Sequence, residues 1–257
     1  MSPADFSVGL CFFHLLIYRG NIWMTYIIGL LALLSCDVGL EANVDGLTVD
    51  VQQVVNYGNR GLKKSFDSAV QLTAFHDEEA IGTASGGYFV YNGYEFILTA
   101  AHVVADGDKF VAHERYGIDT VECKLLYVNK VYDIAVIMPL GDFETLKPVR
   151  FDSDYGMKRG EPLYYTGYPA EMQEITMQGS FAGNAGEYYL MQSSAWMGSS
   201  GSPVFDGQGR VVGVVSGIII GWTPFGFPQL VNNMVVVSPM WAISDSYLKE
   251  LLKDGAN

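Results

Sequence analysis

Cysteine is scarce in this chain of 257 residues, which contains only three. Cys11 and Cys36 fall in an apolar N-terminal stretch, so Cys123 is the only cysteine of the remaining sequence. One thiol cannot form a disulfide within the folded part, which excludes a small scaffold held together by disulfides. The neighbours of Cys123 alternate in a strand-like pattern and predict a small residue of a core or of a strand face.

Positive charge is also scarce, because 15 Lys and Arg residues face 28 Asp and Glu residues, for a net charge of −13. Phosphate contacts need clustered Lys and Arg, so we expect no nucleic-acid partner. The acidic balance indicates solubility rather than a specific partner.

Metal-binding motifs are missing. The sequence has no His-Glu-x-x-His motif and no paired ligand spacing, and only the clusters at 76–79 and 113–114 combine histidine with acidic residues. We interpret both clusters as solvated hairpin loops. We therefore predict no metal and no cofactor.

An uninterrupted membrane-spanning run is missing too, although the N-terminus comes close. Residues 8–18 and 22–34 are apolar and are separated by Arg19-Gly20-Asn21. Neither run reaches the roughly 18 residues of a clean span, but joined they could cross a bilayer. Leu33-Leu34-Ser35-Cys36 resembles a bacterial lipobox, with Cys36 as the acylated residue.

Three interpretations of this stretch stay open: an export leader, lipidated or not; a retained membrane tether through residues 8–36; or upstream translation before a true start at Met24. A start at Met24 leaves a leader without the basic segment that signal peptides carry. The protein is therefore expected to be exported or membrane-associated, with a cytoplasmic or viral origin also open.

The rest of the chain has an all-β pattern. Its 29 glycines, 16 tyrosines and 14 phenylalanines accompany short β-branched runs at regular intervals, and no internal repeat is visible. The predicted strands are 69–75, 87–91, 96–99, 121–128, 134–138, 163–166, 172–179, 188–192, 204–205, 211–215 and 233–237. Helical spacing of apolar residues predicts a helix over 239–253, with Pro239 near its start.

Three short motifs combine chemistry with a meaningful order. An apolar strand runs into His102, a β-branched run surrounds Asp133, and Ser200 lies in the glycine-rich run Gly198-Ser199-Ser200-Gly201-Ser202-Pro203. Alone, the last run is also typical of a flexible loop, and the histidine and the aspartate also fit structural roles. The order His, Asp, Ser is one of the known orders of a catalytic triad.

The residue types fit nucleophilic catalysis. A serine hydroxyl needs a base to take its proton, and histidine has a suitable pKa. A buried carboxylate on the other ring nitrogen fixes the tautomer. In a tight glycine turn, the N–H groups of Gly198 and Ser200 can bind a developing oxyanion. A cysteine nucleophile is excluded because that position is serine.

Residues 66–252 resemble the chymotrypsin-like serine proteases, and most closely their bacterial branch, the HtrA proteases and glutamyl endopeptidases. The resemblance lies in Gly86-Gly87-Tyr88-Phe89-Val90, in 96–104 around His102, in 198–203 around Ser200, and in Val214-Val215-Ser216-Gly217. It implies an all-β fold of two six-stranded antiparallel barrels with a C-terminal helix. It also implies a serine endopeptidase that forms an acyl-enzyme and acts on proteins or peptides.

The resemblance further implies roles for individual residues. The catalytic triad would be His102, Asp133 and Ser200, with the oxyanion hole at Gly198 and Ser200. The first specificity pocket would have Ser194 near its base and Ser216, Gly217 and Ile218 along one wall. No acidic residue lies at the bottom of this pocket, and Ile218 narrows the pocket. We therefore expect it to take small or medium apolar side chains rather than Lys or Arg.

Departures from the family limit these expectations. Ser199 replaces the aspartate that pairs with a new N-terminus in animal digestive members, so we expect no activation by that route. No histidine occurs in 216–220, unlike the pocket of glutamyl endopeptidases. Only 57 residues follow Ser200, and we expect the second barrel and a helix to use them, without a PDZ domain.

The expected organisation is a hydrophobic leader (1–40), a linker (41–65) and a peptidase domain (66–253). The domain would contain barrels at about 66–148 and 155–238 and a helix at 239–253. Two alternative functions stay open: a binding module that has lost turnover, and a viral or phage protease that processes a polyprotein. The sequence leaves the oligomeric state open.

Overall fold

The computed structural model describes residues 41–44, 47–50, 59–114, 120–153, 156–222 and 228–256. The chain divides into two units, residues 1–55 and 56–257. In the first unit, β1 (Glu41–Val44) and β2 (Leu47–Asp50) form an antiparallel pair. The predicted leader and its membrane tether, including Cys36, lie outside the described residues. Within the described ranges, no helix combines the length and the apolar character needed to span a membrane.

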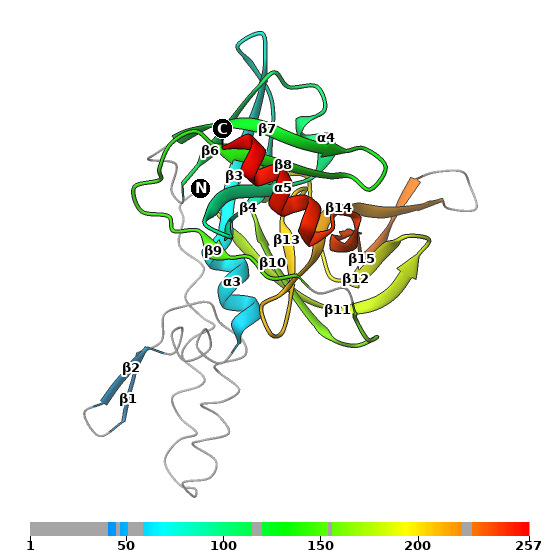
Figure 1. Ribbon diagram of the computed structural model, residues 1–257. Helices are drawn as coiled ribbons and strands as arrows, with labels where there is room; N and C mark the ends of the chain where they lie inside the picture. The colour runs from blue at the N-terminus through cyan, green and yellow to red at the C-terminus, as the bar shows by residue number, and fades with distance from the viewer. Residues whose placement is uncertain are drawn as a thin grey trace, which may run out of the picture. The chain divides into compact units, whose positions relative to one another are not determined.

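The second unit begins with a six-stranded antiparallel barrel (Figure 1). Its strands, in spatial order, are β3 (Ala69–His76), β6 (Lys109–His113), β7 (Thr120–Asn129), β8 (Ile134–Pro139), β5 (Tyr94–Thr99) and β4 (Glu79–Tyr91). β4 closes the barrel because its 13 residues reach two partners: the first part pairs with β3, and the last part pairs with β5. A short β9 (Val149–Arg150) adds to β4 in parallel. β6 was not predicted from the sequence.

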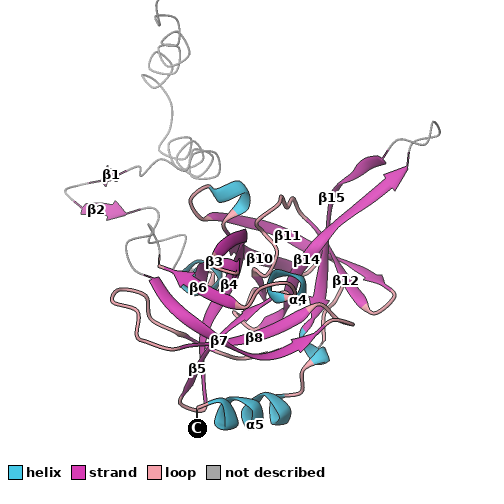
Figure 2. Cartoon of the chain, turned by 90° about the horizontal axis from the view of Figure 1, so that it is seen from above, coloured by secondary structure: helices cyan, strands magenta, loops and turns pink. Residues whose placement is uncertain are grey.

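A second closed barrel follows along the chain. Its strands are β10 (Pro162–Gly167), β11 (Ile175–Ala185), β12 (Tyr188–Gln192), β15 (Pro228–Pro239), β14 (Val211–Trp222) and β13 (Pro203–Asp206). The predicted all-β fold of two six-stranded barrels is therefore confirmed. β14 and β15 continue beyond the predicted segments and extend away from the barrel body (Figure 2).

Helices are short and lie at the edges of the barrels. They are α3 (Arg60–Ser68), α4 (Ala101–Val104), the 3₁₀ turns η2 (Pro169–Glu171) and η3 (Met240–Ala242), and the C-terminal α5 (Asp245–Gly255). The C-terminal helix is confirmed, but its predicted start at Pro239 is wrong. Pro239 precedes only η3, and α5 begins after Ser244, whose hydroxyl accepts the N–H of Tyr247 at 3.3 Å. A serine N-cap therefore sets the start of the helix.

An aromatic cluster joins the two barrels. Phe89 and Phe96 of the first barrel pack around Phe151, with ring centroids 5.4 Å away in each case. Phe89 also lies 6.0 Å from Phe205 of the second barrel, and all four rings are almost fully buried. Burying several aromatic rings at one junction fixes how the barrels meet. The candidate site described below also lies where the two barrels meet.

Candidate active site

His102 follows directly from the core of the first barrel. The end of β5 is fully buried, and the chain then enters the one-turn helix α4, which contains His102. The apolar strand thus anchors the backbone in the core, while the imidazole is 49% exposed and available to a substrate. A general base must be within reach of the group that it deprotonates, and this exposure allows that.

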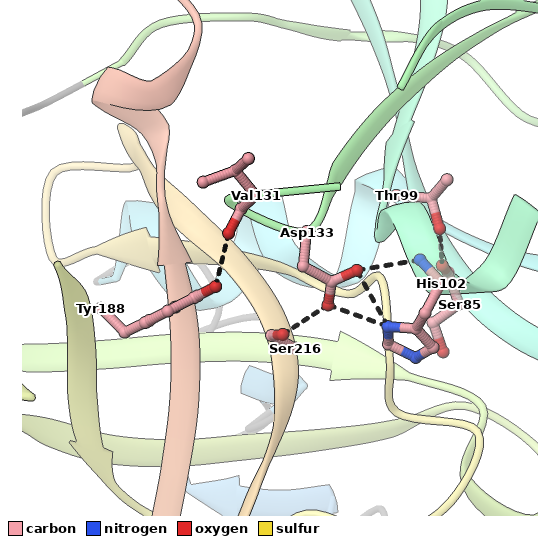
Figure 3. Close-up of polar contacts among 7 residues, drawn as sticks. All are labelled: Ser85, Thr99, His102, Val131, Asp133, Tyr188 and Ser216. Atoms are coloured by element: carbon pink, nitrogen blue, oxygen red, sulfur yellow. Dashed lines mark hydrogen bonds and ion pairs between the residues drawn. The ribbon is translucent and has the colours of Figure 1, made fainter. Parts of the chain in front are cut away.

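Asp133 lies in the turn between β7 and β8 and points at His102 (Figure 3). Its backbone adopts a φ of +53°, which is uncommon for a residue other than glycine. Oδ2 lies 2.8 Å and Oδ1 3.0 Å from Nδ1 of His102, and Oδ1 accepts the backbone N–H of His102 at 2.8 Å. The unusual backbone therefore places one carboxylate on both the ring and the main chain of the histidine.

Charges at this pair favour the ionised carboxylate and a proton on the ring. The hydrogen bond to Asp133 raises the pKa of His102 above its ordinary value, and burial opposes this only in part. Burial raises the pKa of Asp133, but hydrogen bonds from His102 and Ser216 outweigh burial, and the pKa lies below its ordinary value. An ionised Asp133 can only accept, so Nδ1 of His102 donates and Nε2 of the neutral ring is left as the base.

Ser200 lies in a tight turn that only glycine permits. Gly198 and Gly201 adopt φ values of +94° and +89°. A Cβ on Gly201 would lie 2.0 Å from the carbonyl oxygen of Ser85, and one on Gly198 would lie 2.5 Å from that of Tyr168. The two glycines therefore let the turn fold closely against both barrels.

The same turn presents two backbone donors. The carbonyl of Met197 accepts the N–H of Ala170 at 2.7 Å, so the N–H of Gly198, on the other side of that planar peptide, points away from Ala170. Within the described part of the chain, neither the N–H of Gly198 nor that of Ser200 is used in a hydrogen bond. Unused N–H groups in a glycine turn can bind an oxyanion.

A pocket of about 300 Å³ brings the histidine and the serine together. Its lining residues are Ala74, Ile81, Gly82, Thr83, Ala84, His102, Val103, Asp106, Met197, Gly198 and Ser200. His102 and Val103 come from the first barrel and the Ser200 turn from the second, so the pocket exists only where the barrels meet. Most of its walls are small or apolar, as in many ligand-binding pockets.

The residues expected at the specificity pocket lie outside this lining. Ser194 follows β12, and its carbonyl accepts the hydroxyl of Tyr165 while its hydroxyl donates to Asn233 Oδ1 at 3.3 Å. Ser216, Gly217 and Ile218 lie on β14. Ser216 is expected to form a pocket wall, and its hydroxyl donates to Oδ2 of Asp133 (Figure 3).

A β-bulge explains the position of Ser216. Val215 faces Val237 on β15, and Gly217 faces Val236, so Ser216 is an extra residue in β14. An inserted residue turns its side chain away from the regular alternation. The sequence gives no local signal of this bulge, because it depends on the pairing of two distant strands.

Two further supporting residues were not found from the sequence. Ser85 on β4 donates its N–H to the carbonyl of Ser200 at 2.9 Å and its hydroxyl to that of Gly198 at 2.6 Å. The hydroxyl of Tyr188 donates to the carbonyl of Val131 at 2.7 Å, two residues before Asp133 (Figure 3). Each barrel therefore holds a turn of the other: the first barrel holds the turn of Ser200, and the second holds the turn of Asp133.

The two His–acid clusters behave differently from each other. His76 ends β3 at the expected exposed hairpin, 3.6 Å from Asp108. The prediction of a solvated loop is wrong for Glu114, which is 2% exposed and whose carboxylate accepts the N–H groups of Thr145 and Leu146 at 2.9 and 3.2 Å. These hydrogen bonds outweigh the effect of burial and lower the pKa of Glu114. No group of three metal-binding side chains occurs among the described residues.

Cys123 lies where the sequence predicted, in the core of the first barrel. It is 5% exposed, and burial raises the pKa of its thiol to about 12. A thiol with a raised pKa is a poor nucleophile at neutral pH, so Cys123 is a packing residue.

Known proteins resemble this chain in sequence and in fold. Residues 84–214, slightly more than half of the chain, match the model of the trypsin-like peptidase domain. The "Probable periplasmic serine endoprotease DegP-like" proteins of Brucella suis and Brucella abortus are 25% identical over 143 residues, covering 52% of this chain and 28% of theirs. The serine endoprotease of Yersinia pestis has a similar fold, with a TM-score of 0.59 and 17% identity over 76% of this chain and 66% of that one.

Proposed function

Because this chain belongs to the trypsin-like peptidase family, as its sequence motifs indicated, we propose that it is a serine endopeptidase that acts through His102, Asp133 and Ser200. The observation that carries the proposal is that His102, held by two hydrogen bonds to Asp133, lines the same pocket as Ser200. The chain spans only 28% of the length of its DegP-like relatives, so its substrates and partners are proposed from its own residues.

Each step of the proposed reaction has a residue to perform it. Ser200 Oγ attacks the carbonyl carbon of the substrate as Nε2 of His102 takes its proton, and Asp133 stabilises the imidazolium. The N–H groups of Gly198 and Ser200 bind the oxyanion. His102 then gives the proton to the leaving amine, the peptide bond breaks, and an acyl-enzyme on Ser200 remains. Water, deprotonated by His102, hydrolyses the ester and restores the serine.

The walls of the site indicate apolar substrates. The leaving segment of the substrate would lie in the pocket lined by Ala74, Ile81 and Met197. On the other side of the scissile bond, we propose that Ser194, Ser216, Gly217 and Ile218 receive a small or medium apolar side chain. Ser194 has no carboxylate, so this position would not attract a Lys or Arg side chain of the substrate.

Labelling with a fluorophosphonate tests this function directly. The reagent should react with Ser200 alone, because attack of Oγ on phosphorus with loss of fluoride needs the same base and oxyanion hole. Mass mapping of the labelled full-length protein should place the adduct on the peptide that contains Ser200, and heat-denatured protein should remain unlabelled. An unlabelled native protein would instead support a binding module that has lost turnover.

Export or membrane attachment is proposed as well, from the apolar N-terminus and the periplasmic description of the relatives. Deleting residues 1–40 should release the enzyme from membranes and leave kcat/KM on a short peptide within about twofold of that of the full chain, because no residue of the site lies there. Cys36→Ser separates two routes: a lipoprotein would lose detergent partitioning, and an apolar anchor would keep it. A full-length protein that fractionates as soluble with its N-terminus uncleaved would contradict both.

A further inference from the structure

A second pocket lies apart from the candidate active site. It has a volume of about 560 Å³ and shares no lining residue with the pocket of Ser200. One wall is α3, and the other is the segment 145–149, which leads from the first barrel into β9. Figure 1 shows α3 beside β9. The volume falls within the range of pockets that bind small molecules.

Positive charge is concentrated at this pocket, although the net charge of the chain is −13. Its cationic lining residues are Arg60, Lys63, Lys64 and Lys147. Arg150 lies next to it, and its carbonyl accepts a hydrogen bond from the ammonium of Lys64 at 3.2 Å. These five residues are a third of the 15 Lys and Arg residues of the whole sequence. A chain with few cations therefore gathers many of them at one place.

Nearby carboxylates leave most of this charge unbalanced. Asp67, which also lines the pocket, forms an ion pair with Lys63. Within the described part of the chain, Arg60, Lys147 and Arg150 form no ion pair with a carboxylate. Arg60 and Lys147 lie on opposite walls, so unpaired charge faces the pocket from both sides.

The surroundings of Lys64 disfavour its charged form. Burial lowers the pKa of Lys64 below its ordinary value, and the charges of Arg150 and Arg60 lower it as well. Asp152 and Asp206 act in the opposite direction but do not restore the ordinary value. An anion placed among cations that repel one another would stabilise all of them.

Contacts with the two barrels hold both walls in place. The hydroxyl of Ser65 on α3 lies 3.0 Å from that of Thr166 on β10, so the second barrel holds the helix. Buried Glu114, just after β6, accepts two N–H groups of the segment 145–149 at 2.9 and 3.2 Å, and β9 then pairs with β4. Because the walls are already ordered, a ligand loses little binding energy in ordering them.

We propose that this pocket binds a phosphate ester of a small molecule. A phosphate monoester carries nearly two negative charges and three strong acceptor oxygens, which suits several cations better than one carboxylate does. Arg60 and Lys147 bind the phosphate from opposite walls. The volume leaves room for an organic group beside Leu146 and Val149, which are apolar. Soluble esters and phospholipid headgroups share this chemistry.

Calorimetric titration of the full-length protein with glycerol 3-phosphate tests the site. We expect one molecule bound per chain, with a Kd below about 1 mM at low salt, and no binding of glycerol. At roughly ten times the Kd, the ester should raise the unfolding midpoint by about 3–5 °C. Succinate at the same ionic strength should bind at least about tenfold more weakly, because its two charges lie on separate groups.

Charge reversal locates the contact. Arg60→Glu and Lys147→Glu should each raise the Kd at least about tenfold, because each places a carboxylate beside the phosphate. Both side chains are exposed, so the variants should keep the unliganded unfolding midpoint of the wild type. Lys249→Glu is the matched control, since Lys249 is exposed on α5 and outside the pocket. It gives the same net charge as the other two variants and should bind like the wild type.

Vesicles distinguish the two sources of the phosphate. Flotation of the full-length protein with phosphatidylglycerol and with phosphatidylcholine vesicles isolates the effect of headgroup charge, because the apolar N-terminus is present in both mixtures. A lipid source predicts stronger binding to phosphatidylglycerol, and Lys147→Glu, but not Lys249→Glu, should remove this preference. A soluble source predicts that Lys147→Glu weakens binding of glycerol 3-phosphate and leaves vesicle binding unchanged.

Three results would overturn the inference. Binding of neither the soluble ester nor the anionic vesicles would show that the pocket takes no phosphate. Equal losses in Lys147→Glu and Lys249→Glu would show an effect of net charge alone. Succinate that binds as tightly as glycerol 3-phosphate would assign the pocket to carboxylates, such as those of an acidic peptide. Peptide hydrolysis is measured separately, so none of these results would refute the proposed endopeptidase function.

Discussion

Ser200→Ala is expected to lower kcat/KM on a peptide substrate by at least about 10⁴-fold, because it removes the nucleophile and no other group can form the acyl-enzyme. The residual rate would come from the oxyanion donors and from binding. The substitution removes one oxygen from a half-buried side chain, and the backbone bonds that hold the turn, including that between Ser85 and Ser200, remain. The measurement is steady-state hydrolysis of a peptide found by cleavage profiling.

Ser180→Ala provides the matched control for this loss. Ser180 lies on β11 of the same barrel, outside the pocket, and is also half-buried. It should retain wild-type kcat/KM, and both variants should unfold within a few degrees of the wild-type midpoint. Activity of Ser200→Ala within tenfold of the wild-type value would show that another residue is the nucleophile.

Local patterns were enough to single out the three candidate catalytic residues and to predict most strands of an all-β chain, whereas the two barrels were implied by the family resemblance. His102 and Asp133 lie beside apolar strands that form the barrel core, and Ser200 lies in a glycine turn, so each has a signal within a few neighbouring positions. The chain order of the three then limits the choice of site. The backbone conformations of Gly198 and Gly201 follow from the same local pattern.

Contacts between distant segments could not be predicted in this way. Ser216 binds Asp133 because of a bulge in the pairing of β14 with β15, and Ser85 supports Ser200 across 115 positions of sequence. Glu114 was misread as solvated because its partners in Thr145 and Leu146 lie 31 and 32 residues away. Charged residues are exposed on average, but composition cannot reveal a carboxylate that a distant segment of the chain buries.

Asp133→Asn is expected to lower kcat/KM by about 10⁴-fold at neutral pH while leaving the fold intact. An asparagine side chain can donate its N–H to Nδ1 of His102, which fixes the ring proton on Nε2. Nε2 then cannot take the proton of Ser200, although the geometry is kept. Asp142→Asn, the same change at an exposed turn after β8, should retain full activity. Loss of folding in Asp133→Asn, measured by circular dichroism, would make the activity uninformative, and Asp133→Glu would then test the same carboxylate.

The pH dependence of the wild-type enzyme tests the same assignment independently. His102 acts as a base only when neutral, so kcat/KM should rise with pH as His102 loses its proton. Asp133 raises the pKa of His102, and the midpoint should therefore lie above the ordinary value of 6.5. Ser216→Ala removes one of the hydrogen bonds that stabilise the ionised Asp133, so it should reduce kcat/KM several-fold while retaining a single rise with pH. A flat profile between about pH 5 and pH 9, with chemistry rate-limiting, would exclude His102 as the base. An imidazole base must lose its proton within this range, and the rate would then change with pH.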